Sequence, residues 1–201
     1  SRPCDSFRLE TTSHSHGCRS TGQTPREFSL TPIPPPNTLP VTRPPMPTPT
    51  ETHIENRERI KPNQTNNYDT AHGGIVMQLM DETAAMSAMR LAGEPCVTAR
   101  VDGLDFLRPI PRGDIAVIEA WAYRAGETSV DIRVRVDRED PHSGDRKLTS
   151  ESSFRFVAIT EEGKPTPVPE LTIDTDDDEE LRAAGMDAHG GEDGTRLDRA
   201  D

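Results

Sequence analysis

The sequence predicts an α+β domain in which one antiparallel sheet curls round a single long helix. Residues 73–93 form a long helical pattern that is apolar on most sides, and four strand patterns joined by short turns follow it. Short turns require antiparallel neighbours, and an antiparallel sheet can bury one face against a helix. The expected order is therefore one strand, the helix and then four strands.

The first strand is expected in the stretch THIENRERI, residues 52–60. The helix opens at a glycine pair, Gly73 and Gly74, and Gly93 provides its stop signal. A helix that is apolar nearly all round is usually buried. We therefore expect this helix at the centre of the fold.

Four further strands are expected at residues 96–106, 115–125, 130–139 and 148–160. The third of these shows the clearest pattern, because apolar and charged residues alternate strictly along it. Such alternation predicts a half-buried strand with one face in the core and the other in solvent. The apolar set is Val130, Ile132, Val134 and Val136, and the charged set is Asp131, Arg133, Arg135 and Asp137.

The folded region is expected at residues 52–171, between a proline-rich leader and an acidic tail. Nine of the 19 prolines precede Met46, and the leader, residues 1–51, has too little apolar surface to offset the entropy of ordering. One hypothesis is that the natural polypeptide begins at Met46. Residues 172–201 carry eleven acidic and three basic side chains, which is typical of a solvated, disordered end.

Composition excludes several classes of protein. The net charge of −12 leaves no basic footprint for a nucleic acid partner. No run of about 18 apolar residues is present, so no membrane-spanning helix is expected. Three cysteines, Cys4, Cys18 and Cys96, show no paired spacing, which favours a reducing, cytoplasmic setting.

Arginine outnumbers lysine by twenty to three, and eighteen aspartates are present. This balance favours a halophilic protein, in which dense carboxylates keep a hydrated surface and long lysine stems are avoided. The alternative is an ordinary acidic cytosolic protein with a charged tail.

Several blocks resemble the hotdog-fold acyl-CoA thioester hydrolases of the cytosolic type, in order and in spacing. The resemblance covers about residues 52–171 and implies the hotdog fold, a five-stranded antiparallel sheet round one long helix. It also implies hydrolysis of fatty acyl-CoA without metal or organic cofactor, in a homo-oligomer that is at least a dimer and can be a trimer of dimers. The blocks are NNYDTAHGG (66–74), VMQLMDE, VTARVD, FLRPIPRGD (106–114), GETS (126–129) and FVAITEEGKPTPVP.

Asp81 is the residue that the helix pattern does not explain, because a carboxylate among apolar side chains is costly to bury unless it is paired or used. The resemblance implies that Asp81 is catalytic and that Asn66 of another subunit faces it. Asp81 would deprotonate a water or attack the thioester directly, and both roles remain open. The alternative is a structural aspartate paired with a strand arginine such as Arg100.

Gly73 and Gly74 stand at the helix start, where backbone N–H groups lack helical partners and the helix dipole is positive. These donors can hold the thioester oxygen as negative charge develops on it, an effect of about 2.7–4 kcal/mol in comparable sites. The alternative is that the glycine pair only permits close packing. His72, beside the pair, is expected to pack rather than to act as a base.

Coenzyme A carries phosphates, which an acidic protein has to receive at local positive sites. We expect the N–H groups and hydroxyls of the GETS turn to contribute, together with an arginine. For each arginine the alternative is an ion pair with nearby acids. The candidates are Gly126, Thr128, Ser129 and Arg108, with Arg100, Arg112 and Arg124 as further arginines.

Asp69 is a departure from the resemblance, since the family usually has glycine at this position. Glycine there suggests a positive φ, which aspartate tolerates better than most residues. Asp69 also adds negative charge near the expected thioester site. This charge and the acidic tail favour a rival interpretation, a non-catalytic acyl-CoA-binding or regulatory hotdog protein.

Overall fold

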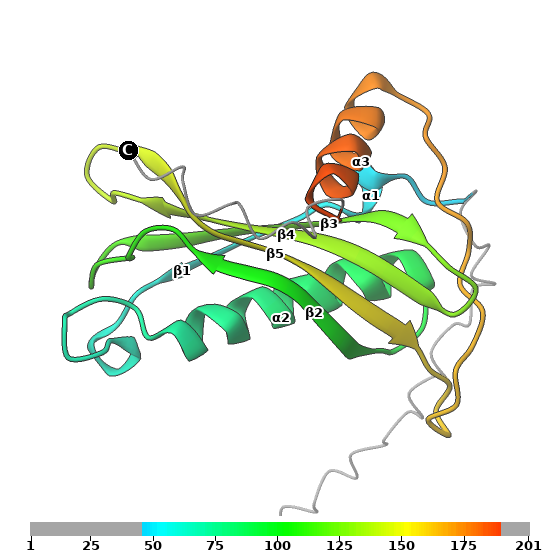
Figure 1. Ribbon diagram of the computed structural model, residues 1–201, viewed down its shortest axis with the longest axis horizontal. Coiled ribbons are helices and arrows are strands. Elements are labelled where there is room, and N and C mark those ends of the chain that lie inside the picture. Colours follow the sequence, from blue (N-terminus) through cyan, green and yellow to red (C-terminus); the bar gives the residue numbers. More distant parts are fainter. Residues whose placement is uncertain (1–45, 190–201) are drawn as a thin grey trace, which may run out of the picture. The chain divides into compact units, whose positions relative to one another are not determined.

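The structure, a computed structural model, describes residues 46–189. The predictions for residues 1–45 and 190–201 lie outside this part. The predicted strands and the predicted helix are confirmed to within two residues at each end. In chain order the elements are α1 (Pro49–Thr52), β1 (Ile54–Arg59), the 3-10 turn η1 (Pro62–Gln64), α2 (Gly73–Ala92), β2 (Cys96–Phe106), β3 (Ile115–Ala125), β4 (Ser129–Glu139), β5 (Arg146–Ala158) and α3 (Asp176–His189) (Figure 1).

The five strands form one sheet in the order β1-β3-β4-β5-β2, and every neighbouring pair is antiparallel. Helix α2 lies on one face of this sheet, and α3 lies on the opposite face, which we call the outer face (Figure 1). The core is therefore the space between α2 and the sheet. None of the helices among residues 46–189 is long and apolar enough to cross a lipid bilayer.

Helix α2 has well-defined ends. His72 caps its start by accepting a hydrogen bond from the Gly74 N–H, and Gly93 ends it in a left-handed conformation at φ 69°. The side facing the sheet is rich in small residues, which allow a close approach to the strands. The buried apolar residues on this side are Val76, Met80, Ala84, Ala88, Leu91 and Ala92.

The other side of α2 is open in the single chain, because one five-stranded sheet covers only one side of a helix. Met77, Met86 and Met89 are each at least 40% exposed. In the single chain, α2 is therefore covered by the sheet on one of its sides and open on the other.

Strand β4 was expected to show one face to solvent, and this prediction is wrong for most of that face. β4 is the central strand, and Asp131, Arg133 and Asp137 on its outer face are buried, whereas Arg135 is exposed as predicted. Charge pairing across neighbouring strands explains this burial. Arg133 Nη2 donates to Glu151 on β5 at 2.5 Å, and Arg155 Nε on β5 donates to Asp131 at 2.6 Å.

The acidic segment after residue 171 was expected to be disordered, and for its first part this prediction is wrong. Residues 176–189 form α3, whose first turn holds four acidic side chains, where negative charge favours a helix. Trp121 Nε1 on β3 donates to the Leu181 carbonyl at 2.8 Å. Gly185 packs so closely on the Tyr123 ring that a Cβ at this position would lie 2.3 Å from it.

The segment just before β1, expected to belong to the leader, is also part of the fold. It forms α1, which hydrogen bonds to the Asp178 carboxylate hold against the start of α3. Asp178 is almost fully buried and accepts hydrogen bonds from the Thr50 N–H at 3.0 Å and the Thr175 N–H at 3.1 Å. Burial alone would raise the pKa of Asp178, but hydrogen bonds, chiefly from Thr50, hold this pKa well below its usual range.

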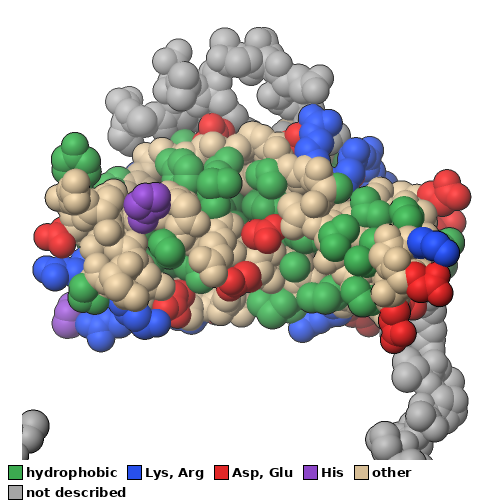
Figure 2. All heavy atoms as spheres, turned by 90° about the horizontal axis from the view of Figure 1, so that it is seen from below, with side chains coloured by type: hydrophobic (Ala, Val, Ile, Leu, Met, Phe, Trp, Pro, Cys, Tyr) green, Lys and Arg blue, Asp and Glu red, His purple; other side chains and the backbone are tan. Residues whose placement is uncertain are grey.

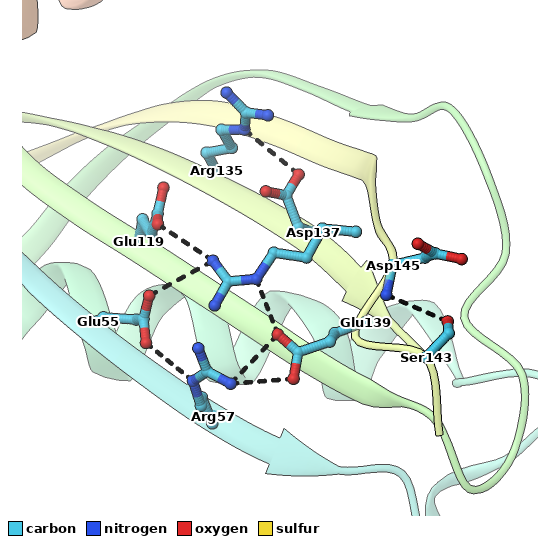
Figure 3. Close-up of polar contacts among 9 residues, drawn as sticks. Glu55, Arg57, Glu119, Arg135, Asp137, Glu139, Ser143 and Asp145 are labelled. Carbon is cyan, nitrogen blue, oxygen red and sulfur yellow. Dashed lines mark hydrogen bonds and ion pairs between the residues drawn. The ribbon is translucent and has the colours of Figure 1, made fainter. Parts of the chain in front are cut away.

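Away from α3, the outer face carries a network of ion pairs (Figure 3). Glu139 on β4 accepts from Arg57 Nη1 at 2.9 Å and from Arg146 Nε at 2.7 Å. Arg57 also pairs with Glu55, and Arg146 lies between Glu55 and Glu119. This charged half of the outer face therefore links β1, β3, β4 and β5 through side chains.

Candidate active site

Asp81 lies in the middle of α2 and points to the edge of the sheet at β2. There the Thr98 Oγ1 donates a hydrogen bond to Asp81 Oδ1 at 2.6 Å. No ion pair of Asp81 is present within the described residues 46–189, and Arg100 pairs with Asp102 instead. The alternative of a structural pair between Asp81 and Arg100 is therefore wrong.

The surroundings of Asp81 are more open in the single chain than expected. Its side chain is half-buried, and β2 beside it is an edge strand that pairs only with β5. Hydrophobic side chains gather on this side of the molecule around isolated carboxylates (Figure 2). The exposed large apolar residues here include Met77, Met86 and Met89 on α2 and Val101 and Phe106 on β2.

Asn66 stabilises a tight turn ahead of α2. Its side chain accepts from the Tyr68 N–H at 2.9 Å and donates to Thr70 Oγ1 at 3.0 Å. Asp81 lies eight residues beyond Gly73, about 12 Å further along the helix. In Figure 1 the turn lies beyond the start of α2. A single chain therefore does not bring Asn66 and Asp81 together.

Asp69 is compatible with this turn. It adopts the left-handed conformation at φ 56°, so the prediction that aspartate tolerates the position is confirmed. Its carbonyl accepts from the Arg112 N–H at 2.9 Å, and its carboxylate faces the Arg112 guanidinium at 3.6 Å. Both side chains are exposed, and the added negative charge has a positive neighbour.

The two glycines at the start of α2 differ in their surroundings. The Gly74 N–H donates to His72 Nδ1 at 3.0 Å, so in this structure it is engaged in capping the helix. For the Gly73 N–H, no hydrogen bond is found among the described residues. A cleft of about 300 Å³ opens beside Gly73, with Phe106 and Arg108 on its wall.

The residues predicted to bind coenzyme A lie at two ends of the sheet. Arg108 follows β2 and donates to the Leu148 carbonyl at 3.1 Å. The GETS turn joins β3 to β4, where the Gly126 N–H donates to the Ser129 carbonyl and the Thr128 carbonyl accepts from Ala158. Ala158 pairs with the first residue of β2, so roughly 30 Å of strand separates the turn from Arg108.

Thr98 is the residue that the sequence interpretation missed. It lies on the strand after α2, and only the packing of β2 along the helix brings its hydroxyl to Asp81. No local pattern in the sequence singles out Thr98 from the other polar residues of this strand.

Comparison with known proteins identifies the family. Residues 68–144 match the family model described as Thioesterase superfamily. An uncharacterized acyl-CoA thioester hydrolase of Bacillus subtilis, YkhA, is 35% identical over 128 residues, which cover 64% of this chain and 74% of that protein. The chain belongs to the thioesterase superfamily.

Solved structures of thioesterases confirm the predicted hotdog fold. An acyl-CoA hydrolase from Staphylococcus aureus, in complex with butyryl coenzyme A, coenzyme A and coenzyme A disulfide, matches with a TM-score of 0.66 at 33% identity; the match covers 72% of this chain and 88% of that one. A hexameric acyl-CoA thioesterase matches with a TM-score of 0.65 at 32% identity, over 71% of this chain and 91% of that one.

Solved variants of the same Staphylococcus aureus thioesterase carry alanine in place of an asparagine, an aspartate or a threonine. In that protein the aspartate follows the asparagine by fifteen residues, and the threonine follows the aspartate by seventeen. Asn66, Asp81 and Thr98 have the same identities and the same spacing.

Proposed function

We propose that the protein hydrolyses fatty acyl-CoA to free fatty acid and coenzyme A in the cytoplasm, with the Asp81 carboxylate as the catalytic base or nucleophile. The observation that carries the proposal is the Asp81 carboxylate, which Thr98 holds at an open edge and which has no ion pair among the described residues. Relatives of this chain are named acyl-CoA thioester hydrolases, and their names support this reaction.

The hydrogen bond from Thr98 suits Asp81 to act on a thioester. It engages Oδ1 and leaves Oδ2 available to a water or to the substrate. Acting as a base, Asp81 would take a proton from the water while the hydroxide adds to the carbonyl carbon. The carbon–sulfur bond then breaks, and the proton passes to the departing thiolate. Acting as a nucleophile, Asp81 would add to the carbonyl carbon and expel the coenzyme A thiolate, which takes up a proton. Water would then hydrolyse the anhydride to the fatty acid and restore the Asp81 carboxylate.

A site between two subunits would supply the groups that one chain keeps apart. Asn66 and the Gly73 N–H both lie at the start of α2, far from the Asp81 of their own chain. With a second copy alongside, Asn66 of one subunit would orient the thioester that Asp81 of the other attacks. The Gly73 N–H would then stabilise the negative charge on the carbonyl oxygen.

The edge of β2 is the natural place for the second copy. An edge strand with exposed apolar residues invites pairing with another strand, and a two-fold contact would place the same strand on both sides. The pairing would bury Val97, Val101 and the open side of α2. It would also bring the GETS turn and Arg108 of different subunits to a common surface for coenzyme A. The hexameric neighbour is in keeping with such an oligomer.

The rival, a non-catalytic acyl-CoA-binding or regulatory protein, depended on Asp69 and the acidic tail. Arg112 faces Asp69, and the first part of the tail packs as α3 on the side opposite α2. Neither feature therefore favours the rival over the enzyme.

Thiol release from acyl-CoAs of several chain lengths, in molar KCl, tests the proposal. Asp81→Asn should lower kcat at least about 100-fold, because it removes the base or nucleophile. Glu82→Gln is the matched control, since Glu82 is the exposed neighbour of Asp81 and, within the described part of the chain, accepts a hydrogen bond from Gln78 alone. Undiminished turnover in Asp81→Asn, or acyl-CoA binding without thiol release in the unaltered protein, would refute the proposal.

A further inference from the structure

A second pocket lies on the outer face, between α3 and the end of β3. Its volume is about 330 Å³, at the lower end of the range for small-ligand sites. Tyr123 and Arg124 of β3 form part of its wall, and Arg182 and Met186 of α3 form another part. Because α2 lies on the opposite face, this pocket is separate from the site of Asp81 (Figure 1).

The β3 side of the pocket carries excess positive charge. Arg124 Nε and Arg155 Nε each donate to the buried carboxylate of Asp131 at 2.6 Å, so two guanidiniums share one carboxylate. Burial alone would raise the pKa of Asp131, but hydrogen bonds from Arg155 and Arg124 lower it, so Asp131 stays ionised. Arg124 is about half exposed and lines the pocket, and within residues 46–189 no hydrogen bond is found for its two Nη groups.

The α3 side adds a second cation. Arg182 is exposed, and no hydrogen bond or ion pair is found for its guanidinium within residues 46–189. Glu170 is the carboxylate on the wall of the pocket. Two arginines and one glutamate therefore line this cavity, in a protein with a net charge of −12.

The rest of the wall is apolar. Leu171 and Met186 lie beside the arginines, and the Tyr123 ring closes the pocket from the sheet. A ligand that fits both parts needs an anionic group for the guanidiniums and an apolar or flat group for the remaining wall. We propose that this pocket binds a nucleotide, with its phosphate against Arg124 and Arg182 and its nucleoside against Leu171 and Met186.

Two sources can supply such a nucleotide. One is a free nucleotide that binds apart from catalysis, and the other is the nucleotide end of coenzyme A, since the GETS turn follows Arg124 directly along the chain. Only the second source rests on the proposed hydrolase function.

Calorimetric titration of the full chain with ADP tests the proposal. Arg182→Gln should weaken ADP binding about tenfold, because it removes a charge-assisted hydrogen bond to phosphate. Glu170→Gln should strengthen binding a few-fold, because it removes a repelling carboxylate. Lys147→Gln is the matched control, since it removes one positive charge from an exposed site at the far end of β5 and should leave ADP binding unchanged.

Titration with coenzyme A separates the two sources. If Arg182→Gln also weakens coenzyme A binding and ADP competes with coenzyme A, the pocket holds the substrate's own nucleotide. If coenzyme A binding is unchanged, the pocket holds a free nucleotide. The proposal is overturned if the protein binds neither ADP nor coenzyme A. It is also overturned if Arg182→Gln and Lys147→Gln bind these ligands with equal affinity. Calorimetry needs no turnover, so an inactive Asp81→Asn chain serves equally and keeps this test independent of the proposed hydrolysis.

Discussion

At one end of the outer face, β3 lies under α3, where Trp121 donates to the Leu181 carbonyl and Tyr123 packs on Gly185. Two residues before Trp121, the same strand carries Glu119, which belongs to the charged half and lies near Arg146 (Figure 3). We call the part of the outer face under α3 the helix-covered half. Its contacts are buried, so water cannot readily replace a partner that is lost. The charged half consists of ion pairs that water and salt can replace.

The difference shows that one face of a sheet can be covered either by a packed helix or by a network of ion pairs. The two arrangements contribute unequally to the free energy of unfolding. Buried, hydrogen-bonded groups are costly to disturb because their partners lose hydration as well as the bond. Surface ion pairs contribute roughly 0–1 kcal/mol each. Substitutions in the helix-covered half should therefore cost more than substitutions in the charged half.

The largest effect is expected from Asp178→Ala. It removes the acceptor for the Thr50 and Thr175 N–H groups and should lower the free energy of unfolding by about 3 kcal/mol. Asp177→Ala is the matched control, because Asp177 is exposed in the same turn. Urea unfolding of both variants measures the difference, and equal losses in the two would show that α3 does not depend on this carboxylate.

Asp178 also predicts a pH dependence. Its folded-state pKa is lowered from an ordinary value of 3.8, so the unfolded chain takes up a proton first as the pH falls. The stability that Asp178 contributes is therefore fully present above about pH 5 and declines at lower pH. The stability difference between the parent and Asp178→Ala should shrink from pH 6 to pH 3, and a constant difference would contradict the assignment.

The next largest effect is expected from Gly185→Ala. Its new Cβ would lie 2.3 Å from the Tyr123 ring, so α3 has to move away from β3. This overpacking should lower the free energy of unfolding by about 2 kcal/mol, even though alanine has a higher helix propensity than glycine. Trp121 fluorescence in urea reports the change. Stabilisation, the usual result of placing alanine in a helix, would show that α3 does not rest on Tyr123.

The positions of the strands and of α2 were predictable because their signals are local. β2 and β3 begin and end at the predicted residues, since alternation and turn residues lie within each segment. α3 was missed because its partners, Trp121 and Tyr123, are more than fifty residues earlier in the sequence. The acidic run at residues 176–180 therefore does not predict that this segment packs on β3.

The candidate site divides in the same way. Asp81 was recognised within its own helix, as a carboxylate in an apolar pattern, but Thr98 was not, because their contact needs β2 to lie along α2. The separation of Asn66 from Asp81 also became evident only from the fold. Contacts between subunits decide whether Asn66 of a second chain lies near Asp81. The local sequence patterns around Asn66 and Asp81 do not encode such contacts.

The smallest effect is expected in the charged half, from Glu139→Gln. Glu139 accepts from both Arg57 and Arg146, so its loss should cost about 1 kcal/mol in dilute buffer. Salt weakens these partly exposed pairs, so in molar KCl the difference from the parent should shrink. Glu162→Gln, which breaks a fully exposed pair with Lys164, should change the free energy of unfolding by less than about 0.5 kcal/mol in either buffer. A cost for Glu139→Gln that matches Asp178→Ala and persists in salt would remove the distinction between the two halves.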